Sequence, residues 1–178
     1  MTDAAHILEP FVEGWAGYQR LLLDAIRPLT PEQLSSRTAP FQWAVWQLAS
    51  HIAGSRASWF HDLLGEGDPA FHEMFLVEST TVPDLPLEDA RWEDNERRPR
   101  SASELTDAFE RTWAMIEEAL GRWTAADLAM EFTRTRRNGE VETMTRAWVV
   151  WHLIEHDLHH GGEISQILGT NGIPAPEL

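Results

Sequence analysis

The chain has 178 residues, of which 43% are hydrophobic and 24% charged, so we expect one globular domain over residues 1–178 with a substantial buried core. A formal net charge of −15 disfavours binding to nucleic-acid phosphates and to anionic membrane surfaces. The absence of cysteine excludes disulfides, thiolate metal ligands and a cysteine nucleophile.

The N-terminal residues Met1–His6 contain neither the basic nor the apolar stretch of a signal peptide. No apolar run approaches the roughly 20 residues of a membrane helix, and we therefore expect a cytoplasmic protein. From Ala4 to Ile26, apolar residues recur at steps of three and four, which predicts an amphipathic helix that Pro28 ends.

Thr30 and Gln33 have the spacing of a capping box and predict a short helical turn. A second long helix is predicted from about Gln42 to Leu64. Residues 65–100 contain four prolines and many acids, which predicts a long crossover with a short helix near residues 71–76. This crossover either covers one end of the molecule or is a solvated linker.

Ser101 and Glu104 form another predicted capping box, which begins a third long helix that ends near Arg122. After a short turn at residues 124–127, Asn138-Gly139 between alternating residues predicts a small β-hairpin. The fourth long helix is predicted from about residue 143 to residue 168. These elements predict an all-α fold, a four-helix bundle with a crossover between the second and third helices and a hairpin before the fourth.

Two nine-residue stretches resemble each other at a constant offset, residues 43–51 (WAVWQLASH) and residues 148–156 (WVVWHLIEH). If the halves of the chain are related by an approximate two-fold axis, His51 and His156 face each other at equivalent heights. Alternatively, two tryptophan-rich core helices match by chance. The recurring residues are Trp43, Val45, Trp46, Leu48 and His51, which return as Trp148, Val150, Trp151, Leu153 and His156.

The fourth helix carries His152, His156 and His160 at steps of four, on nearly the same helical face. His156 and His160 have the spacing with which two imidazoles chelate one ion, and the repeat places His51 opposite them. We therefore predict that His51, His156 and His160 bind a divalent metal ion and leave positions open for water or substrate. Successive steps of four drift by about 40° around a helix, so His152 is predicted to support the site rather than to ligate. The alternative is that these histidines are core residues of a scaffold protein.

Residues beside this cluster have two interpretations. Glu155 and Asp157 are either solvated, or one of them accepts a hydrogen bond from a ligand imidazole. Gly161-Gly162 lowers helix stability and predicts close packing against the backbone. The sequence lacks a glycine-rich phosphate loop, a zincin motif, a G-x-S-x-G elbow and the paired Glu-x-x-His motifs of di-iron bundles.

The segment at residues 155–164 (EHDLHHGGEI), with Trp46-x-Leu-x-x-His51 upstream, resembles the DinB-like superfamily. That group includes the DinB, YfiT and mycothiol-dependent maleylpyruvate isomerase types, and the pattern is similar to its bacterial members over nearly the whole chain. The resemblance implies an up-down-down-up four-helix bundle and a divalent metal, often nickel or zinc, held by three histidines that map onto His51, His156 and His160. It also implies that homodimers are common. Where the family often has Arg or Gln after His-x-Gly, this chain has Gly162-Glu163, so no substrate contact is carried over.

The resemblance further implies a reaction class, because characterised relatives use bacillithiol or mycothiol and others are described as metal-dependent hydrolases. Since the chain has no cysteine, a thiol would come from a small molecule. The leading hypothesis is that a metal-bound thiolate attacks an electrophile, in a thiol S-transferase or an isomerase; metal-activated water, giving a hydrolase, is the second. The alternative function is a non-catalytic small-molecule or stress-related binding protein that retains the metal site.

Overall fold

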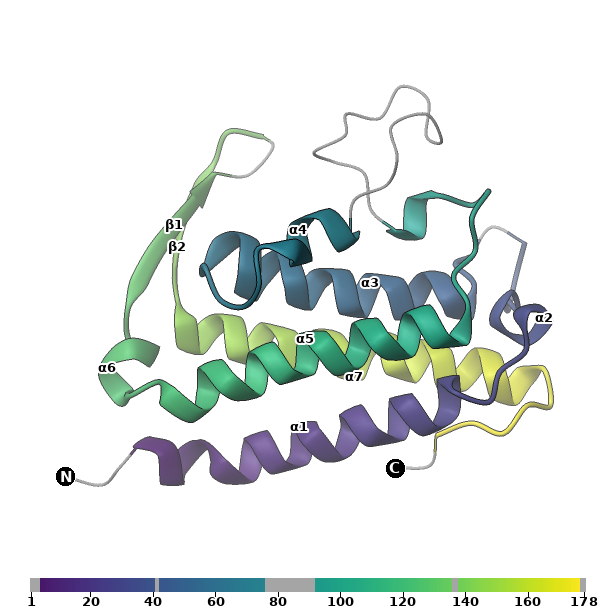
Figure 1. The fold of residues 1–178 in the computed structure, drawn as a ribbon, viewed down its shortest axis with the longest axis horizontal. Helices are drawn as coiled ribbons and strands as arrows, with labels where there is room; N and C mark the ends of the chain where they lie inside the picture. Colours follow the sequence, from purple (N-terminus) through teal and green to yellow (C-terminus); the bar gives the residue numbers. More distant parts are fainter. Residues whose placement is uncertain (1–3, 41, 76–91, 136–137, 177–178) are drawn as a thin grey trace.

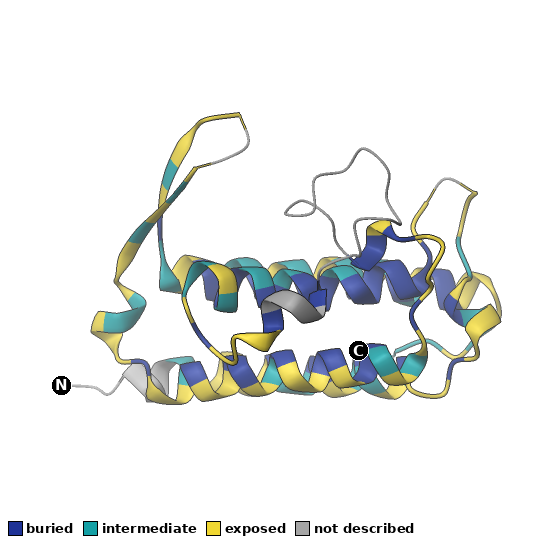
Figure 2. Cartoon of the chain, turned by 45° about the horizontal axis from the view of Figure 1, so that its top comes forward, coloured by how far each residue is buried: buried dark blue, intermediate teal, exposed yellow. Residues whose placement is uncertain are grey.

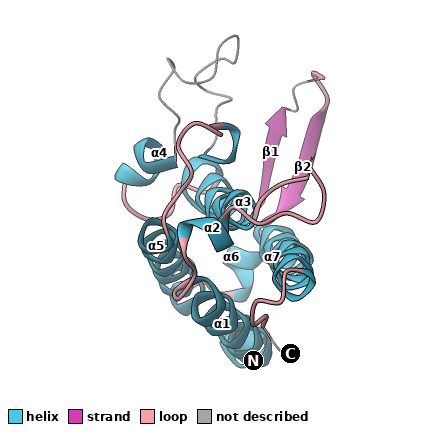
Figure 3. Cartoon of the chain, turned by 90° about the vertical axis from the view of Figure 1, so that its right-hand side faces the viewer, coloured by secondary structure: helices cyan, strands magenta, loops and turns pink. Residues whose placement is uncertain are grey.

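The computed structural model describes residues 4–40, 42–75, 92–135 and 138–176, and Figure 1 shows their arrangement. Four long helices dominate the fold and lie roughly parallel or antiparallel to one another, as the end-on view in Figure 3 shows. Helix α3 packs against both α5 and α7, and α1 covers α5 and contacts α7. The long helices are α1 (Ala4–Ile26), α3 (Val45–Ala57), α5 (Ala102–Arg122) and α7 (Arg146–Thr170).

The sequence signals for helix starts are confirmed. Thr30, Ser101 and Thr124 each accept a hydrogen bond from the backbone N–H three residues later, at the starts of α2 (Pro31–Leu34), α5 and α6 (Ala125–Leu128). In each case the side chain three residues later accepts a hydrogen bond from the backbone N–H of the capping residue. The pair of hydrogen bonds satisfies two backbone N–H groups that would otherwise be unpaired. Helix α1 has the bounds that the apolar period predicts.

The predicted hairpin is present as β1 (Glu131–Thr135) and β2 (Val141–Thr145), which pair in antiparallel register with Glu131 opposite Thr145. Gly139 in the turn has a φ of 86°, a left-handed conformation that glycine adopts without strain. The second strand continues to Thr145, whose hydroxyl caps α7. Helix α7 therefore begins at Arg146, three residues later than predicted.

The predicted second helix is divided. Helix α3 ends at Ala57, and the chain continues as one π-helical segment, η1 (Ser58–Leu63), before Gly65 turns with a φ of 72°. In this segment the neighbouring side chains of Trp59 and Phe60 are both buried.

The crossover contains the predicted short helix, α4 (Ala70–Phe75), and a 3₁₀ turn, η3 (Trp92–Asp94). Phe71, Phe75 and Trp92 are buried, and η3 packs on α3. The described ends of the crossover therefore cover α3 and are not a solvated linker. Residues 76–91, including the end of the predicted short helix, lie outside the described residues.

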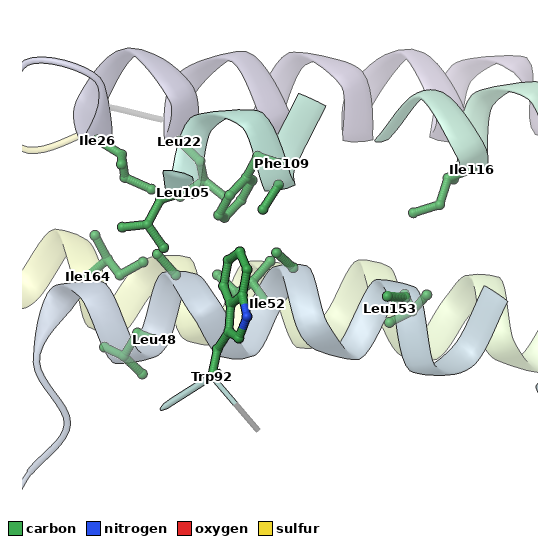
Figure 4. Packing of buried hydrophobic residues seen from close by; sticks show 14 of the residues in the cluster. Leu22, Ile26, Leu48, Ile52, Trp92, Leu105, Phe109, Ile116, Leu153 and Ile164 are labelled. Atoms are coloured by element: carbon green, nitrogen blue, oxygen red, sulfur yellow. The ribbon is translucent and has the colours of Figure 1, made fainter. Parts of the chain in front are cut away.

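The hydrophobic core runs along the centre of the four long helices. Figure 2 shows buried residues on their inner faces and exposed residues on their outer faces. In Figure 4, Leu22 of α1, Phe109 of α5 and Leu153 of α7 contribute to this core, and Trp92 of η3 points toward α3. Among the described residues, no helix is both long enough and apolar enough to cross a lipid bilayer.

Candidate metal centre

The three predicted ligands come together where α3 packs against α7. His51 lies on α3, and His156 and His160 lie one turn apart on α7. The buried side chains of Leu48 and Leu153 fix the rotation of the two helices, so that the histidine faces meet.

The imidazoles converge closely. The Nε2 atoms of His51 and His156 are 3.1 Å apart, and their ring centroids are 4.8 Å apart. The His160 ring centroid lies 4.8 Å from that of His51 and 4.5 Å from that of His156. One nitrogen from each of the three side chains lies within 4.8 Å of the other two.

This donor set fits a divalent transition-metal ion. Two imidazole nitrogens bound to one tetrahedral zinc are about 3.3 Å apart, given a Zn–N distance of about 2.0–2.1 Å, which is close to the observed His51–His156 separation of 3.1 Å. Three neutral nitrogen donors also suit nickel. The side chains are 27%, 12% and 16% exposed for His51, His156 and His160, so the site is shielded yet reachable from solvent.

The local electrostatics favour the neutral form of His160. Burial lowers the pKa of His160, and the neighbouring His156 and His51 lower it further, although the hydrogen bond with Glu163 acts in the opposite direction. A neutral ring is the form that can bind a metal.

His152 lies outside this cluster, as the drift of the helix predicts. Its ring stacks on Trp148, meets Trp59 edge-on, and lies 5.9 Å from the ring of His156. Burial lowers the pKa of His152, and so does the adjacent His156. This histidine packs against aromatic rings beside the centre.

A second group of potential ligands consists of His159, His160 and Glu163. His159 and Glu163 are exposed, and the Glu163 carboxylate is already within 2.7 Å of His160 Nδ1. This group shares His160 with the first and is less shielded, so the three-histidine group is the stronger candidate.

The internal repeat explains most, but not all, of the surroundings. Leu48 and its counterpart Leu153 are both buried, as the two-fold relation predicts. Trp46 is 2% exposed, however, whereas its counterpart Trp151 is 61% exposed. The difference arises because α5 and the crossover pack on α3, while α7 has fewer elements against it.

Carboxylates face the outer nitrogens of all three imidazoles. Glu93 Oε1 lies 2.8 Å from His51 Nδ1, and Glu163 Oε2 lies 2.7 Å from His160 Nδ1. Asp157 Oδ1 lies 4.0 Å from His156 Nδ1, which is too far for a hydrogen bond. Of the two acids considered from the sequence, Glu155 is exposed and Asp157 is fully buried. Glu93 could not be identified from the sequence, because it lies in an irregular segment 42 residues after His51.

Asp157 belongs to a buried polar network that joins the four long helices. Its Oδ2 atom accepts hydrogen bonds from Trp15 Nε1 of α1 and from Nε and a terminal nitrogen of Arg56 of α3. Gln19 accepts a hydrogen bond from Arg56 and donates one to the Phe109 carbonyl. Burial acts to raise the pKa of Asp157. The Arg56 guanidinium, together with the hydrogen bonds that the carboxylate accepts from Arg56 and Trp15, outweighs this effect and holds the pKa below its ordinary value.

A pocket of about 350 Å³ opens beside His160. Its wall combines two amides, a hydroxyl, one carboxylate and three apolar side chains. It is lined by Thr38, Gln42, Trp43, Leu48, His160, Glu163, Gln166 and Ile167. The size and mixed polarity suit a small molecule.

The chain is similar to known proteins in sequence and in fold. A sequence model described as the DinB family matches residues 1–178. The crystal structure of a DinB-like protein from Bacillus cereus ATCC 10987 is similar with a TM-score of 0.63 and 21% identity, covering 96% of this chain and 97% of that one. A conserved protein from Enterococcus faecalis is similar with a TM-score of 0.67 and 16% identity, covering 92% and 98%. At these identities the two structures show the fold alone. No curated protein sequence matches the chain.

Proposed function

The chain belongs to the DinB family, and from that premise we propose that it is a metal-dependent enzyme in which His51, His156 and His160 hold a divalent ion, nickel or zinc. The observation that carries this proposal is the convergence of three imidazole nitrogens from α3 and α7. A divalent ion held in this way lowers the pKa of a water or thiol that reaches it and so makes either a better nucleophile.

The pocket beside His160 is the proposed place of the substrate. Trp43 and Ile167 offer apolar surface, and Gln42 and Gln166 offer amide groups that orient a polar molecule. Because the pocket adjoins a ligand imidazole, a molecule held there has its reactive group next to the metal position.

A small-molecule thiol is the proposed nucleophile, in an S-transferase or isomerase reaction. The chain contains no cysteine of its own, so the sulfur comes with the cosubstrate. Water in place of thiol, in a hydrolase reaction, is the second form of this proposal.

One observation favours a non-catalytic alternative. Of the described residues that line the pocket, only His160 and Glu163 are ionisable, and they interact with each other. A pocket with no other acid or base suits a protein that binds a small molecule at the retained metal site.

The test is a thiol-consumption assay with protein loaded with zinc or nickel. A panel of low-molecular-weight thiols, including bacillithiol and mycothiol, is combined with electrophiles, and the loss of free thiol is measured. We expect metal-dependent turnover in the wild type and in His159→Ala, an exposed neighbour of the cluster, and none in His156→Ala. Tight ligand binding without turnover for any thiol or hydrolysable ester would support the binding-protein alternative.

We also propose the finer architecture and the assembly. In Figure 1, α1 and α7 run in one direction and α3 and α5 in the other, which supports an up-down-down-up four-helix bundle. Trp148, Trp151 and Leu158 are exposed along α7, which supports a homodimer through this helix. Light scattering coupled to size-exclusion chromatography tests the dimer, and a monomer at micromolar concentration would contradict it.

A further inference from the structure

The crossover supplies an acid to the metal centre. Glu93, in η3, places Oε1 2.8 Å from Nδ1 of His51. Its side chain is 6% exposed, so the contact is shielded from water. This carboxylate comes from neither of the helices that carry the three histidines.

Glu93 is held in position by its own surroundings. Its backbone carbonyl accepts a 2.9 Å hydrogen bond from Gln47 Nε2, and Gln47 is itself fixed by a hydrogen bond from the Ala44 amide to its Oε1. The preceding residue, Trp92, is buried, with its ring 4.8 Å from that of Phe75 and 4.4 Å from the Arg100 guanidinium carbon. The segment is therefore anchored independently of His51.

The chemistry of the contact determines which nitrogen faces the centre. An ionised carboxylate only accepts hydrogen bonds, so the proton of a neutral His51 lies on Nδ1. Nε2 then carries the lone pair of the ring, and it is the atom that lies 3.1 Å from His156 Nε2. Fixing the tautomer in this way prepares the ring to ligate.

Of the three carboxylates around the centre, Glu93 has the most specific contact. Glu163 meets His160 at similar distance, but its side chain is 45% exposed and so interacts with solvent. Asp157 is fully buried, but its Oδ2 binds Arg56 and Trp15, and its Oδ1 is 4.0 Å from His156. Only the Glu93 contact among these is both short and shielded.

We propose that Glu93 is a positioning residue that holds His51 as the Nδ1–H tautomer and presents Nε2 to the metal, so that the crossover is part of the metal centre. The inference rests on the proposed metal function. It gives the buried end of the crossover a role beyond covering α3.

The first test reads the tautomer without any metal. Long-range ¹H–¹⁵N NMR of metal-free protein identifies which nitrogen of His51 carries the proton. We expect Nδ1–H in the wild type and in Glu93→Gln, because the amide oxygen still accepts the bond. In Glu93→Leu, which removes the acceptor, we expect a substantial fraction of Nε2–H. An unchanged Nδ1–H signal in Glu93→Leu would overturn the proposal.

The second test measures zinc and nickel affinity by competition with a chromophoric chelator. We expect Glu93→Leu to weaken metal binding by about 10–100-fold relative to the wild type. Glu93→Asp, whose carboxylate is one methylene shorter, should also weaken it. Glu93→Gln should keep most of the wild-type affinity. The matched control is Glu155→Gln, which removes one exposed carboxylate next to His156 and should change affinity less than about twofold.

The outcomes separate this inference from the proposed function. A wild type that binds neither metal contradicts the metal function itself, whatever the NMR result. If the wild type binds metal and either Glu93→Leu or Glu93→Asp binds it with equal affinity, only the role of Glu93 is contradicted, and the metal function stands. If Glu93→Leu does not fold, the affinity of Glu93→Asp decides.

Discussion

Arg56 and Asp157 form an ion pair with no exposed side-chain surface, 2.6 Å apart, next to the proposed ligand His156. Burying two charges is costly, and a broken buried pair leaves a charge without compensation. We predict that Asp157→Asn lowers the free energy of unfolding by about 3–5 kcal/mol, measured by urea denaturation.

A double variant separates charge pairing from packing. Replacing both residues by apolar ones, Arg56→Met with Asp157→Leu, leaves no isolated charge and should be more stable than either single variant. If the double variant is less stable than both, the network stabilises the fold through its hydrogen bonds to Trp15 and Gln19 rather than through charge pairing.

The site residues that could be predicted from the sequence lie on regular helices. The steps of four on α7 and the repeat on α3 were enough to select His51, His156 and His160, because helical geometry fixes relative positions. Glu93 could not be found in this way, since a short 3₁₀ turn after a long crossover has no period that relates it to His51. Whether the three histidines bind a metal stays a prediction.

The contact of α1 with α7 depends on the absence of a side chain at Gly161. A Cβ at this position would lie 2.8 Å from Tyr18 Cζ and overlap the phenol hydroxyl, whereas a Cβ at Gly162 meets nothing within 4 Å. We predict that Gly161→Ala destabilises the protein by about 1–3 kcal/mol through overpacking.

Gly162→Ala is the matched control for that variant. It makes the same chemical change one residue later and should stabilise α7 by up to about 1 kcal/mol through helix propensity. Thermal unfolding of the two variants measures the difference, and equal stabilities would contradict this account of how α1 and α7 pack.

The start of α5 gives a pH dependence. Burial acts to raise the pKa of Glu104, but hydrogen bonds from Ser101 and the nearby Arg100 and Arg98 outweigh it and lower the pKa. A depressed folded-state pKa contributes stability above the unfolded value of about 4.3, and the contribution is lost as the pH falls through the folded value.

We therefore predict that Glu104→Gln is less stable than the wild type at pH 7, that the difference shrinks as the pH falls below the unfolded value of about 4.3, and that it disappears below the folded value. Urea denaturation across this range measures it. Glu118→Gln, an exposed change on the same helix, serves as the control. A difference between wild type and Glu104→Gln that persists at pH 3 would show that the carboxylate charge is not its cause.

At the level of elements, capping and turn residues predicted the positions of helices and turns more accurately than the apolar pattern did. The two predicted capping boxes, the short turn at residues 124–127 and the Asn-Gly turn were all confirmed, because these signals act within four residues. The π-helical end of the second helix and the later start of α7 were not predicted. Both depend on what packs or pairs with the segment, which a local pattern does not contain.

At the scale of the whole molecule, the proposed metal joins α3 to α7. Any ligand that binds only the folded state stabilises it, by about 2.7 kcal/mol at a free concentration 100 times its dissociation constant. For a protein of this size we expect zinc or nickel to raise the melting temperature by about 5–10 °C. His156→Ala should show no such rise, and His159→Ala should show it in full.

The whole fold also shows where internal symmetry ends. The repeat correctly predicted that His51 and His156 lie close together. It did not predict that Trp46 is buried whereas Trp151 is exposed. The crossover follows only the first half of the repeat, so the two halves have different neighbours.

The most direct measurement of the central claim is the metal content of purified protein, by inductively coupled plasma mass spectrometry after zinc or nickel loading and removal of excess ion. We predict about one divalent ion per chain in the wild type and in His159→Ala, and almost none in His51→Ala, His156→Ala and His160→Ala. Stoichiometric metal that persists in folded His156→Ala would contradict the three-histidine centre.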